Sequence, residues 1–315
     1  TAQIGPRGIS EVRPYWTLPE PGESLDVDPR RAVELVGEAL RAAVDDNLVA
    51  DVPVGSYLSG GIDSSLIAAL AAARRPTDSP LATFSAGFDD PATDELPHAR
   101  VVSQHLGTDH TEVTVTASRF AEDWERLTWH RDAPLSEPAD LAVHQLALAA
   151  SERVKVVLSG EGSDELFGGY PKHRMAAFSV SAGAVPGPVR RGAAARVHHL
   201  PGRARRAAVA VRALSGRTDT ERLGSWFAPF TAQERAALLG RPVAPPPPSS
   251  RHHGDALRRM LATDAGPWLA DNLLERGDRM TMAASVELRP PFLDNRLVDL
   301  AFRLPSSVKV HKGVG

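Results

Sequence analysis

An apolar strand runs into a glycine turn and a predicted helix at Val52-Pro53-Val54-Gly55-Ser56-Tyr57-Leu58-Ser59-Gly60-Gly61-Ile62-Asp63-Ser64-Ser65. The two glycines let the backbone turn sharply, so its N–H groups can approach an anion at the start of the helix. The spacing is not that of a Walker loop, which needs Gly-Lys-Ser/Thr, nor of a dinucleotide fingerprint, which needs G-x-G-x-x-G. The pattern therefore predicts a pyrophosphate-binding turn, with a plain βαβ connection as the alternative.

An acidic side chain, Asp63, lies inside this predicted anion-binding turn. A carboxylate there would repel phosphate unless a divalent cation lay between the two groups, which indicates Mg²⁺. A second predicted strand, 154–158, also ends in a polar loop with acids, among them Asp164 and Glu165. Ligands of open parallel sheets gather beyond the carboxyl ends of the strands, so we expect Asp63 and Asp164 to hold one metal ion. Stabilisation of a helix N-terminus is the alternative role for Asp164 and Glu165.

The composition is that of a globular protein of 315 residues, 42% of them hydrophobic, which is enough for one large or two ordinary domains. Cysteine is absent, which excludes disulfides, thiolate metal ligands and a cysteine nucleophile within this chain. No apolar run reaches membrane-spanning length and no charged-then-apolar leader opens the sequence, so we expect a cytoplasmic protein without a membrane partner. Residues 171–218 carry ten Lys or Arg and no acid. Because this segment is Ala-rich and poor in aromatics, solvated helices are favoured over nucleic-acid binding.

Short apolar strands alternate with helical segments over the first half of the chain, which predicts a parallel sheet with helices on both faces. Asp28 is the expected N-cap of the first helix, with Pro29 in its first turn. Residues 1–28 show no sustained period and are predicted to be a linker or docking arm. Beyond Tyr170 we expect helices only, with a Pro-rich loop at 242–250. The expected strands cover 52–58, 81–88, 111–115 and 154–158, and the expected helices cover 29–48, 66–73, 94–106, 119–129 and 140–150.

Four blocks of this sequence, taken together, resemble the synthetase domain of asparagine synthetase (glutamine-hydrolysing), within the ATP-pyrophosphatase (PP-loop) superfamily. The resemblance covers almost the whole chain and implies a Rossmann-like α/β fold over 29–315, with a helical portion from about 171. The blocks are Ser59-Gly60-Gly61-Ile62-Asp63-Ser64; 83–88 with Asp94-Glu95 and 106–110; Leu158-Ser159-Gly160-Glu161-Gly162-Ser163-Asp164-Glu165-Leu166-Phe167-Gly168-Gly169-Tyr170; and Asp278-Arg279-Met280 with 283–294.

The resemblance implies an ATP site across the strand ends. The implied chemistry is attack of the aspartate β-carboxylate on the α-phosphorus of ATP, which gives an acyl-adenylate and pyrophosphate. Attack of ammonia on the acyl carbon then gives asparagine and AMP. Adenine and ribose would lie near Tyr57, Leu58, Ala86, Ser159 and Gly160, pyrophosphate within Ser59, Gly60, Gly61, Asp63 and Ser64, and Mg²⁺ between Asp63 and Asp164.

Three further residues are assigned by the same resemblance. Glu161, which two glycines flank, is the expected base that removes a proton from the attacking nitrogen. In relatives that close β-lactam rings this position resembles a tyrosine, so a glutamate here favours amide formation with ammonia. The alternative is that Glu161 is a solvated loop acid without a catalytic role. Arg279 and Arg289 are expected near a substrate carboxylate, because guanidinium groups bind carboxylates well. An ion pair of Arg289 with Glu287 or Asp294 is the alternative.

Some features depart from the family pattern. Nothing corresponds to the N-terminal glutaminase domain, so we expect that domain in the full-length protein, with 1–28 as the joining segment. Lys309 and Lys312 lie near the place of a family lysine without matching it, and 135–145 lacks clear Thr and Arg matches to the aspartate-binding stretch. The acceptor stays open between aspartate and another carboxylate, such as a peptide or an antibiotic precursor. A non-catalytic nucleotide-binding domain is the third hypothesis, and a homodimer is compatible with the resemblance.

Overall fold

The computed structural model describes the chain apart from residues 7, 20–22, 77, 89–93, 136, 198–204, 228–229, 231, 242–253 and 311–315. The predicted Pro-rich loop at 242–250 and Lys312 therefore lie outside the described residues. No described helix combines the length and the apolar character that a membrane span needs.

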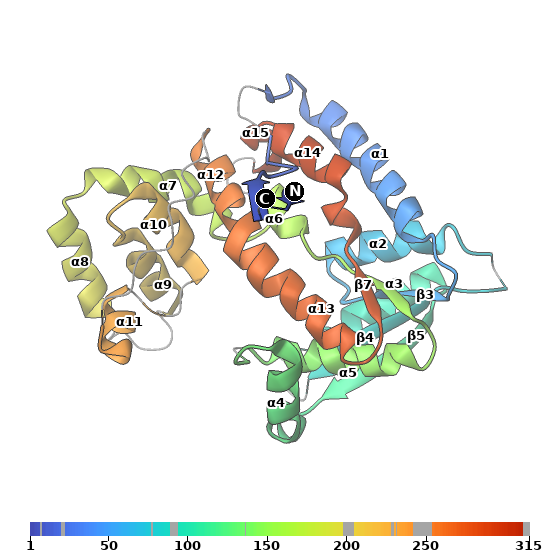
Figure 1. Cartoon of the computed structure of the whole chain (residues 1–315). Coiled ribbons are helices and arrows are strands. Elements are labelled where there is room, and N and C mark those ends of the chain that lie inside the picture. The colour runs from blue at the N-terminus through green and yellow to red at the C-terminus, as the bar shows by residue number, and fades with distance from the viewer. Residues whose placement is uncertain are drawn as a thin grey trace.

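A five-stranded parallel sheet lies at the centre of the α/β part (Figure 1). Its order is β5-β4-β3-β6-β7, so the chain adds β4 and β5 on one side of β3 and then crosses to the other side. The boundary between β3 and β6 is thus the point where the winding reverses, which is where open α/β sheets bind ligands. The strands are β3 (Val54–Tyr57), β4 (Ala82–Phe88), β5 (Asp109–Val115), β6 (Val156–Leu158) and β7 (Glu287–Arg289).

One face of this sheet is covered by α1 (Pro29–Asn47), α2 (Ile62–Ala72), α3 (Leu96–Leu106) and α14 (Asn295–Arg303). Val54, Val156 and Leu158 point to this face and pack in one core cluster with residues of α1, α2 and α14. As predicted, α1 begins after Asp28, whose carboxylate accepts the N–H groups of Arg30 and Arg31 at 2.8 and 2.9 Å. This cap satisfies two donors that the helix itself cannot.

The opposite face is covered by α4 (Ala117–Arg131), α5 (Ala139–Ser151) and α13 (Glu275–Met282). Val157 of β6 alternates with its neighbours and points to this side, where it packs with Phe84, Ala150 and Val286. Met280 of α13 packs with the cluster that α4 and α5 form against β5. The sheet is therefore enclosed by helices on both faces, which confirms the predicted fold class.

A largely helical portion follows the loop after β6 and begins with α6 (Ser163–Phe167). Figure 1 shows α7 to α11 gathered away from the sheet and α12 leading back toward it. The elements are η2 (His173–Met175), α7 (Ala176–Ser181), η3 (Ala182–Ala184), α8 (Gly187–Arg196), α9 (Arg205–Leu214), α10 (Asp219–Gly224), η6 (Ser225–Phe227), α11 (Ala232–Leu239), α12 (Ala256–Thr263) and the π-helical η7 (Asp264–Leu274). After α13 come β7, η8 (Pro291–Leu293), α14 and α15 (Ser306–Lys309).

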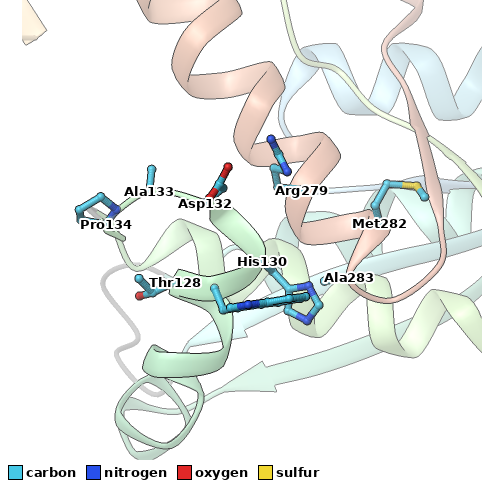
Figure 2. Close-up of a pocket in the computed structure, with 9 residues that line it drawn as sticks. Thr128, His130, Asp132, Ala133, Pro134, Arg279, Met282 and Ala283 are labelled. Atoms are coloured by element: carbon cyan, nitrogen blue, oxygen red, sulfur yellow. The ribbon is translucent and has the colours of Figure 1, made fainter.

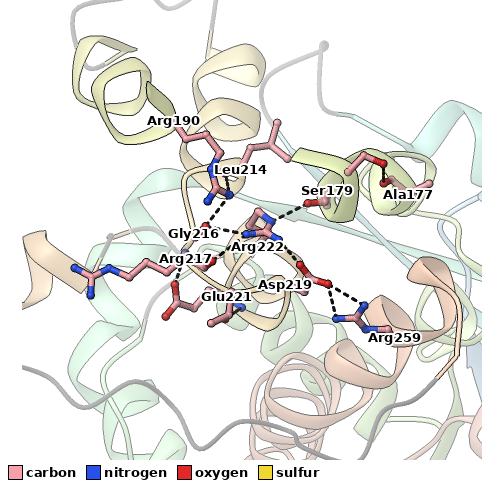
Figure 3. Close-up of polar contacts among 12 residues, drawn as sticks. Ala177, Ser179, Arg190, Leu214, Gly216, Arg217, Asp219, Glu221, Arg222 and Arg259 are labelled. Atoms are coloured by element: carbon pink, nitrogen blue, oxygen red, sulfur yellow. Dashed lines mark hydrogen bonds and ion pairs between the residues drawn. The ribbon is translucent and has the colours of Figure 1, made fainter. Parts of the chain in front are cut away.

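A buried arginine holds this helical portion together (Figure 3). Arg222 of α10 donates its Nε–H to the carbonyl of Ser179 in α7 at 2.9 Å and pairs with Asp219. Asp219 also pairs with Arg259 of α12 at 3.1 Å. Within the basic segment 171–218, Arg190 donates to the carbonyls of Leu214 and Gly216 at 3.3 and 3.0 Å, and Arg212 pairs with Glu234 at 2.6 Å. These contacts agree with a structural role of these two arginines.

Two predictions about the chain's organisation were wrong. β7 lies beyond Tyr170, where only helices were expected; it has three residues, too few to show a period of two, and Val286 before it follows a left-handed turn at Ser285. The segment 1–28 contains an antiparallel hairpin of β1 (Ala2–Gly5) and β2 (Gly8–Val12), although no regular element was expected there. Ile4 and Ile9 are 79% and 65% exposed, so the hairpin lacks the buried side that makes a strand recognisable in sequence.

Candidate active site

The glycine turn after β3 has the geometry of an anion-binding loop. Gly60 adopts a left-handed φ of 80°, and a Cβ there would lie 2.5 Å from the backbone of His98, so only glycine fits. The Ser59 and Ser64 hydroxyls lie 2.9 Å apart, and the Ser59 N–H donates to Ser64 Oγ at 3.1 Å. α2 begins directly after Gly61, and its first N–H groups have no carbonyl of the same helix to bond. Those donors are suited to a phosphate group.

The loop after β6 packs directly on this turn, because β3 and β6 are paired neighbours. A Cβ at Gly160 would lie 2.9 Å from the backbone nitrogen of Ser64 and 3.2 Å from Cβ of Asp63. The hydroxyl of Ser163 donates to Oδ1 of Asp63 at 2.9 Å. The structure thus brings together two motif loops that are about one hundred residues apart in the chain.

The carboxylates of Asp63 and Asp164 are electrostatic neighbours at this junction. Burial, and then the charge of Asp63, raise the pKa of Asp164. Gly169 leaves room for this carboxylate, since a Cβ there would lie 1.8 Å from Asp164 Oδ1. The described residues contain no cluster of three or more His, Cys, Asp or Glu side chains that would enclose a metal ion. Two carboxylates beside a phosphate-binding loop are instead the donor set typical of Mg²⁺ bound through a nucleotide, so the residues fit that ion.

Glu161 lies between the sheet and α13, and its Oε2 is buried without a hydrogen-bond partner among the described residues. A Cβ at Gly277 of α13 would lie 3.1 Å from that oxygen. Burial raises the pKa of Glu161 from 4.5 to about 7, against the opposing charge of Arg276, while Glu165 adds to the rise. A carboxyl group with a pKa near neutrality is well suited to accept a proton during a reaction.

Other predicted nucleotide contacts divide into core residues and buried polar groups. Leu58 is buried against Ala68 and Ala99, and its N–H and carbonyl already bond Phe84 and Ser85. Ala86 packs beside the core cluster of α4 and α5. The hydroxyls of Tyr57 and Ser159 are buried and have no hydrogen-bond partner in the part of the chain that the structure describes.

The two predicted substrate arginines lie in different surroundings. Arg279 of α13 is half exposed, lies 3.5 Å from Glu275, and lines an open pocket of about 610 Å³ with Trp129, His130 and Met282 (Figure 2). Arg289 of β7 pairs with Glu287 at 2.7 Å and donates to the carbonyls of Asn47 and Val49 at 2.9 and 2.8 Å. These contacts favour the ion-pair interpretation of Arg289 over the substrate interpretation.

Arg276 is a site residue that the sequence did not single out. It pairs with Glu137 at 3.0 Å through one guanidinium nitrogen, while its buried Nε has no hydrogen-bond partner among the described residues. The charge of Arg276 lowers the pKa of Glu161, so the two side chains lie close to each other. Its position one residue before Gly277 would have been the only signal, and that glycine lies just outside the quoted motif.

Lys309, near the expected place of a family lysine, lies over the ring of Phe302, with Nζ 5.3 Å from the ring centre. Burial and the charge of Arg258 lower its pKa to about 7. Its ring contact is thus with α14, and the charges that act on it are those of Arg258 in α12 and of Asp255, the N-cap of that helix.

Comparison with known proteins gives the family of the chain. The asparagine synthase family model matches residues 35–315. A putative glutamine-hydrolysing asparagine synthetase of Mycobacterium bovis is 36% identical over 293 residues, which are 90% of this chain and 44% of that protein. Glutamine-hydrolysing asparagine synthetase 1 of Bacillus subtilis is 30% identical over 92% of this chain and 46% of its own length. The amidase chyE of Penicillium rubens is 37% identical over 54% of this chain and 27% of its own.

The chain therefore spans about half or less of the length of the relatives that it matches along most of its sequence. The matched region includes both motif loops, the strands that carry them and the segment from α13 to β7. By the family match and by the relatives, this chain belongs to the asparagine synthase family.

Proposed function

We propose that this chain is an ATP-dependent amide-forming ligase that adenylates a carboxylate and then transfers the acyl group to ammonia. The observation that carries the proposal is the contact between the two motif loops, in which Ser163 binds Asp63 beside Asp164. The backbone donors of the Ser59–Ser64 turn would hold the pyrophosphate portion of ATP as it leaves. Asp63 and Asp164 would hold Mg²⁺, which neutralises charge on the phosphates when bound.

Glu161 would act in the second half of the reaction. When ammonia attacks the acyl carbon, the new C–N bond forms, the C–O bond to AMP breaks, and the nitrogen must lose a proton. Glu161 Oε2 is buried and lacks a partner among the described residues, so it is free to accept that proton. Its pKa of about 7 leaves a large fraction of the side chain ionised at neutral pH.

Arg276 would bind the acceptor. Its unpartnered Nε and its position beside Glu161 suit a carboxylate group of the substrate, which guanidinium binds through well-directed donors. We favour aspartate, whose second carboxylate would bind Arg276 while the first reacts. Another carboxylate is the second candidate, because residues 135–145 lack clear Thr and Arg matches to the aspartate-binding stretch of the family.

The remaining parts of the proposal concern the surroundings of the reaction. We place the reaction in the cytoplasm, with ammonia supplied by a glutaminase domain of the full-length protein, as the names of the glutamine-hydrolysing relatives suggest. Residues 1–28 would join the two domains. A homodimer is also proposed, and analytical ultracentrifugation of the chain tests it.

The test is product analysis with MgATP, aspartate and ammonium. We expect AMP, pyrophosphate and asparagine in equal amounts. Asp63→Asn should remove pyrophosphate formation, whereas Glu161→Gln should keep it and lose asparagine. Formation of ADP by the unaltered protein, or nucleotide binding without turnover for any carboxylate, would refute the proposal.

A further inference from the structure

Tyr57 is the last residue of β3, and its side chain does not share the environment of the glycine turn that follows. Its ring packs on the α5 face of the sheet, against the cluster formed by Phe84, Ala150, Val157 and Val286, together with Leu288. The nucleotide turn instead leads into α2, on the opposite face. The hydroxyl of Tyr57 therefore projects toward the layer of α5 and α13.

That layer also contains the carboxyl group of Glu161. A Cβ at Gly277 would lie 2.6 Å from Leu288 and 3.1 Å from Glu161 Oε2, so α13 approaches both the carboxylate and a leucine that packs on the same cluster as Tyr57. The charge of Glu161 contributes to the raised pKa of the Tyr57 phenol, after burial itself. The phenol and the carboxylate are thus neighbours.

Both groups have unused hydrogen-bonding capacity. Tyr57 Oη and Glu161 Oε2 are buried and have no partner among the residues that the structure describes. Buried polar atoms without partners are rare in folded proteins and call for an occupant. The absence of a side chain at Gly277 lets α13 lie close to Glu161 Oε2, which a Cβ there would approach to 3.1 Å.

We propose that Tyr57 Oη and Glu161 Oε2 together form a subsite for ammonia. This inference rests on the proposed function and adds a second residue to its ammonia-dependent step. Ammonia has three N–H donors and one lone pair. Two of its N–H groups would donate to the carboxylate and to the phenol oxygen, which leaves the lone pair directed at the acyl carbon. In the reaction the proton passes to Glu161, and the electron pair of the broken C–O bond leaves with AMP.

The subsite also accounts for the charges that face it. Two charged side chains act on Glu161: Arg276 lowers the pKa of its carboxyl group, and Glu165 raises it. Tyr57 is neutral, because burial raises the pKa of its phenol. A neutral phenol can orient ammonia without adding a charge that would compete with Arg276 for the acceptor carboxylate.

The experiment compares Tyr57→Phe with the unaltered chain and with Tyr15→Phe, a matched control whose tyrosine is 87% exposed. Carboxylate-dependent exchange between ATP and pyrophosphate measures adenylation, and amide formation at varied ammonium concentration measures the second step. Both are taken on the same preparation, so their ratio does not depend on the fraction of folded protein.

We expect Tyr57→Phe to raise the KM for ammonium about tenfold and to lower the ratio of amide formation to exchange at low ammonium by the same factor, as loss of one hydrogen bond predicts. Tyr15→Phe should change neither quantity. An unchanged KM, or an equal loss of exchange and amide formation, would overturn the inference while leaving the proposed function intact. A chain without exchange for any carboxylate would instead overturn the proposed function and this inference together.

Discussion

Replacing Glu161 by glutamine should stabilise the fold while it removes amide formation. The carboxyl group has a pKa of about 7 in the folded chain and an ordinary value of 4.5, a difference of about 2.5. Each pKa unit corresponds to about 1.4 kcal/mol, so ionised Glu161 destabilises the folded state by up to about 3 kcal/mol. The glutamine side chain of the variant carries no charge and avoids that penalty.

The sign and the pH window follow from the same two values. Below pH 4.5 the side chain is protonated in both folded and unfolded chains, so Glu161→Gln should leave the free energy of unfolding nearly unchanged. Between pH 4.5 and about 7 the unfolded chain loses the proton first, and the unaltered protein loses stability as pH rises. Above that range the advantage of the variant should reach about 2–3 kcal/mol, because the unpaired amide offsets part of the gain.

Urea denaturation at pH 4.5 and at about pH 8 measures this difference. The matched control is Glu38→Gln on α1, an exposed glutamate, for which a change within about 0.5 kcal/mol is expected at both pH values. An equal effect of Glu161→Gln at the two pH values would refute the assignment of a buried, partnerless carboxylate. Retained asparagine formation by the same variant would refute its role as the base.

Three further substitutions probe the site and its support. Gly169→Ala would place a Cβ 1.8 Å from Oδ1 of Asp164 and so displace that carboxylate. Calorimetry should show at least tenfold weaker binding of MgATP, with little change in the binding of ATP without Mg²⁺. Equal weakening of both would contradict a metal role of Asp164. Arg289→Met removes an ion pair and two hydrogen bonds to carbonyls, so it should lower the free energy of unfolding by about 1–3 kcal/mol. The KM for aspartate should stay unchanged. A raised KM would restore the interpretation of Arg289 as a substrate-binding residue. The carboxylate of Asp264 lies 2.6 Å from Lys172 Nζ and 2.8 Å from His173 Nε2, and all three side chains are buried. Asp264→Asn removes that charge and should destabilise the chain by about 3–5 kcal/mol in urea denaturation. An unchanged urea midpoint would show that Asp264 does not form a buried ion pair.

The parallel sheet and its two motif loops could be predicted because their signals are local. Residues 54–57 and 156–158 are short apolar runs that end in glycine-rich polar loops, and the N-cap at Asp28 fixes the start of α1. The period of the sequence could not reveal β7, whose three residues become a strand only by pairing with β6. Nor could it reveal the β1–β2 hairpin, because the side chains of that hairpin whose burial the structure describes are all exposed.

The site was predictable to the level of loops and not to the level of side-chain direction. The proximity of Tyr57 to adenine and ribose stays a prediction of the family resemblance. The direction of its ring, toward the α5 face of the sheet, follows from the alternation of side chains along β3. Arg276 depends on a tertiary contact between α13 and the β6 loop, which no spacing in the sequence records. Arg289 was ambiguous in sequence for the same reason, and its partners include carbonyls at the end of α1.

Transfer of oxygen from the acceptor to AMP tests the central claim, that the two motif loops hold ATP for adenylation of a carboxylate. The unaltered chain is incubated with MgATP, ammonium and aspartate labelled with ¹⁸O in its side-chain carboxylate, and the nucleotide product is analysed by mass spectrometry. The account predicts one labelled oxygen in AMP, because attack on the α-phosphorus leaves a carboxylate oxygen on that phosphate when ammonia displaces it. Label in inorganic phosphate together with ADP, or AMP without label, would contradict it.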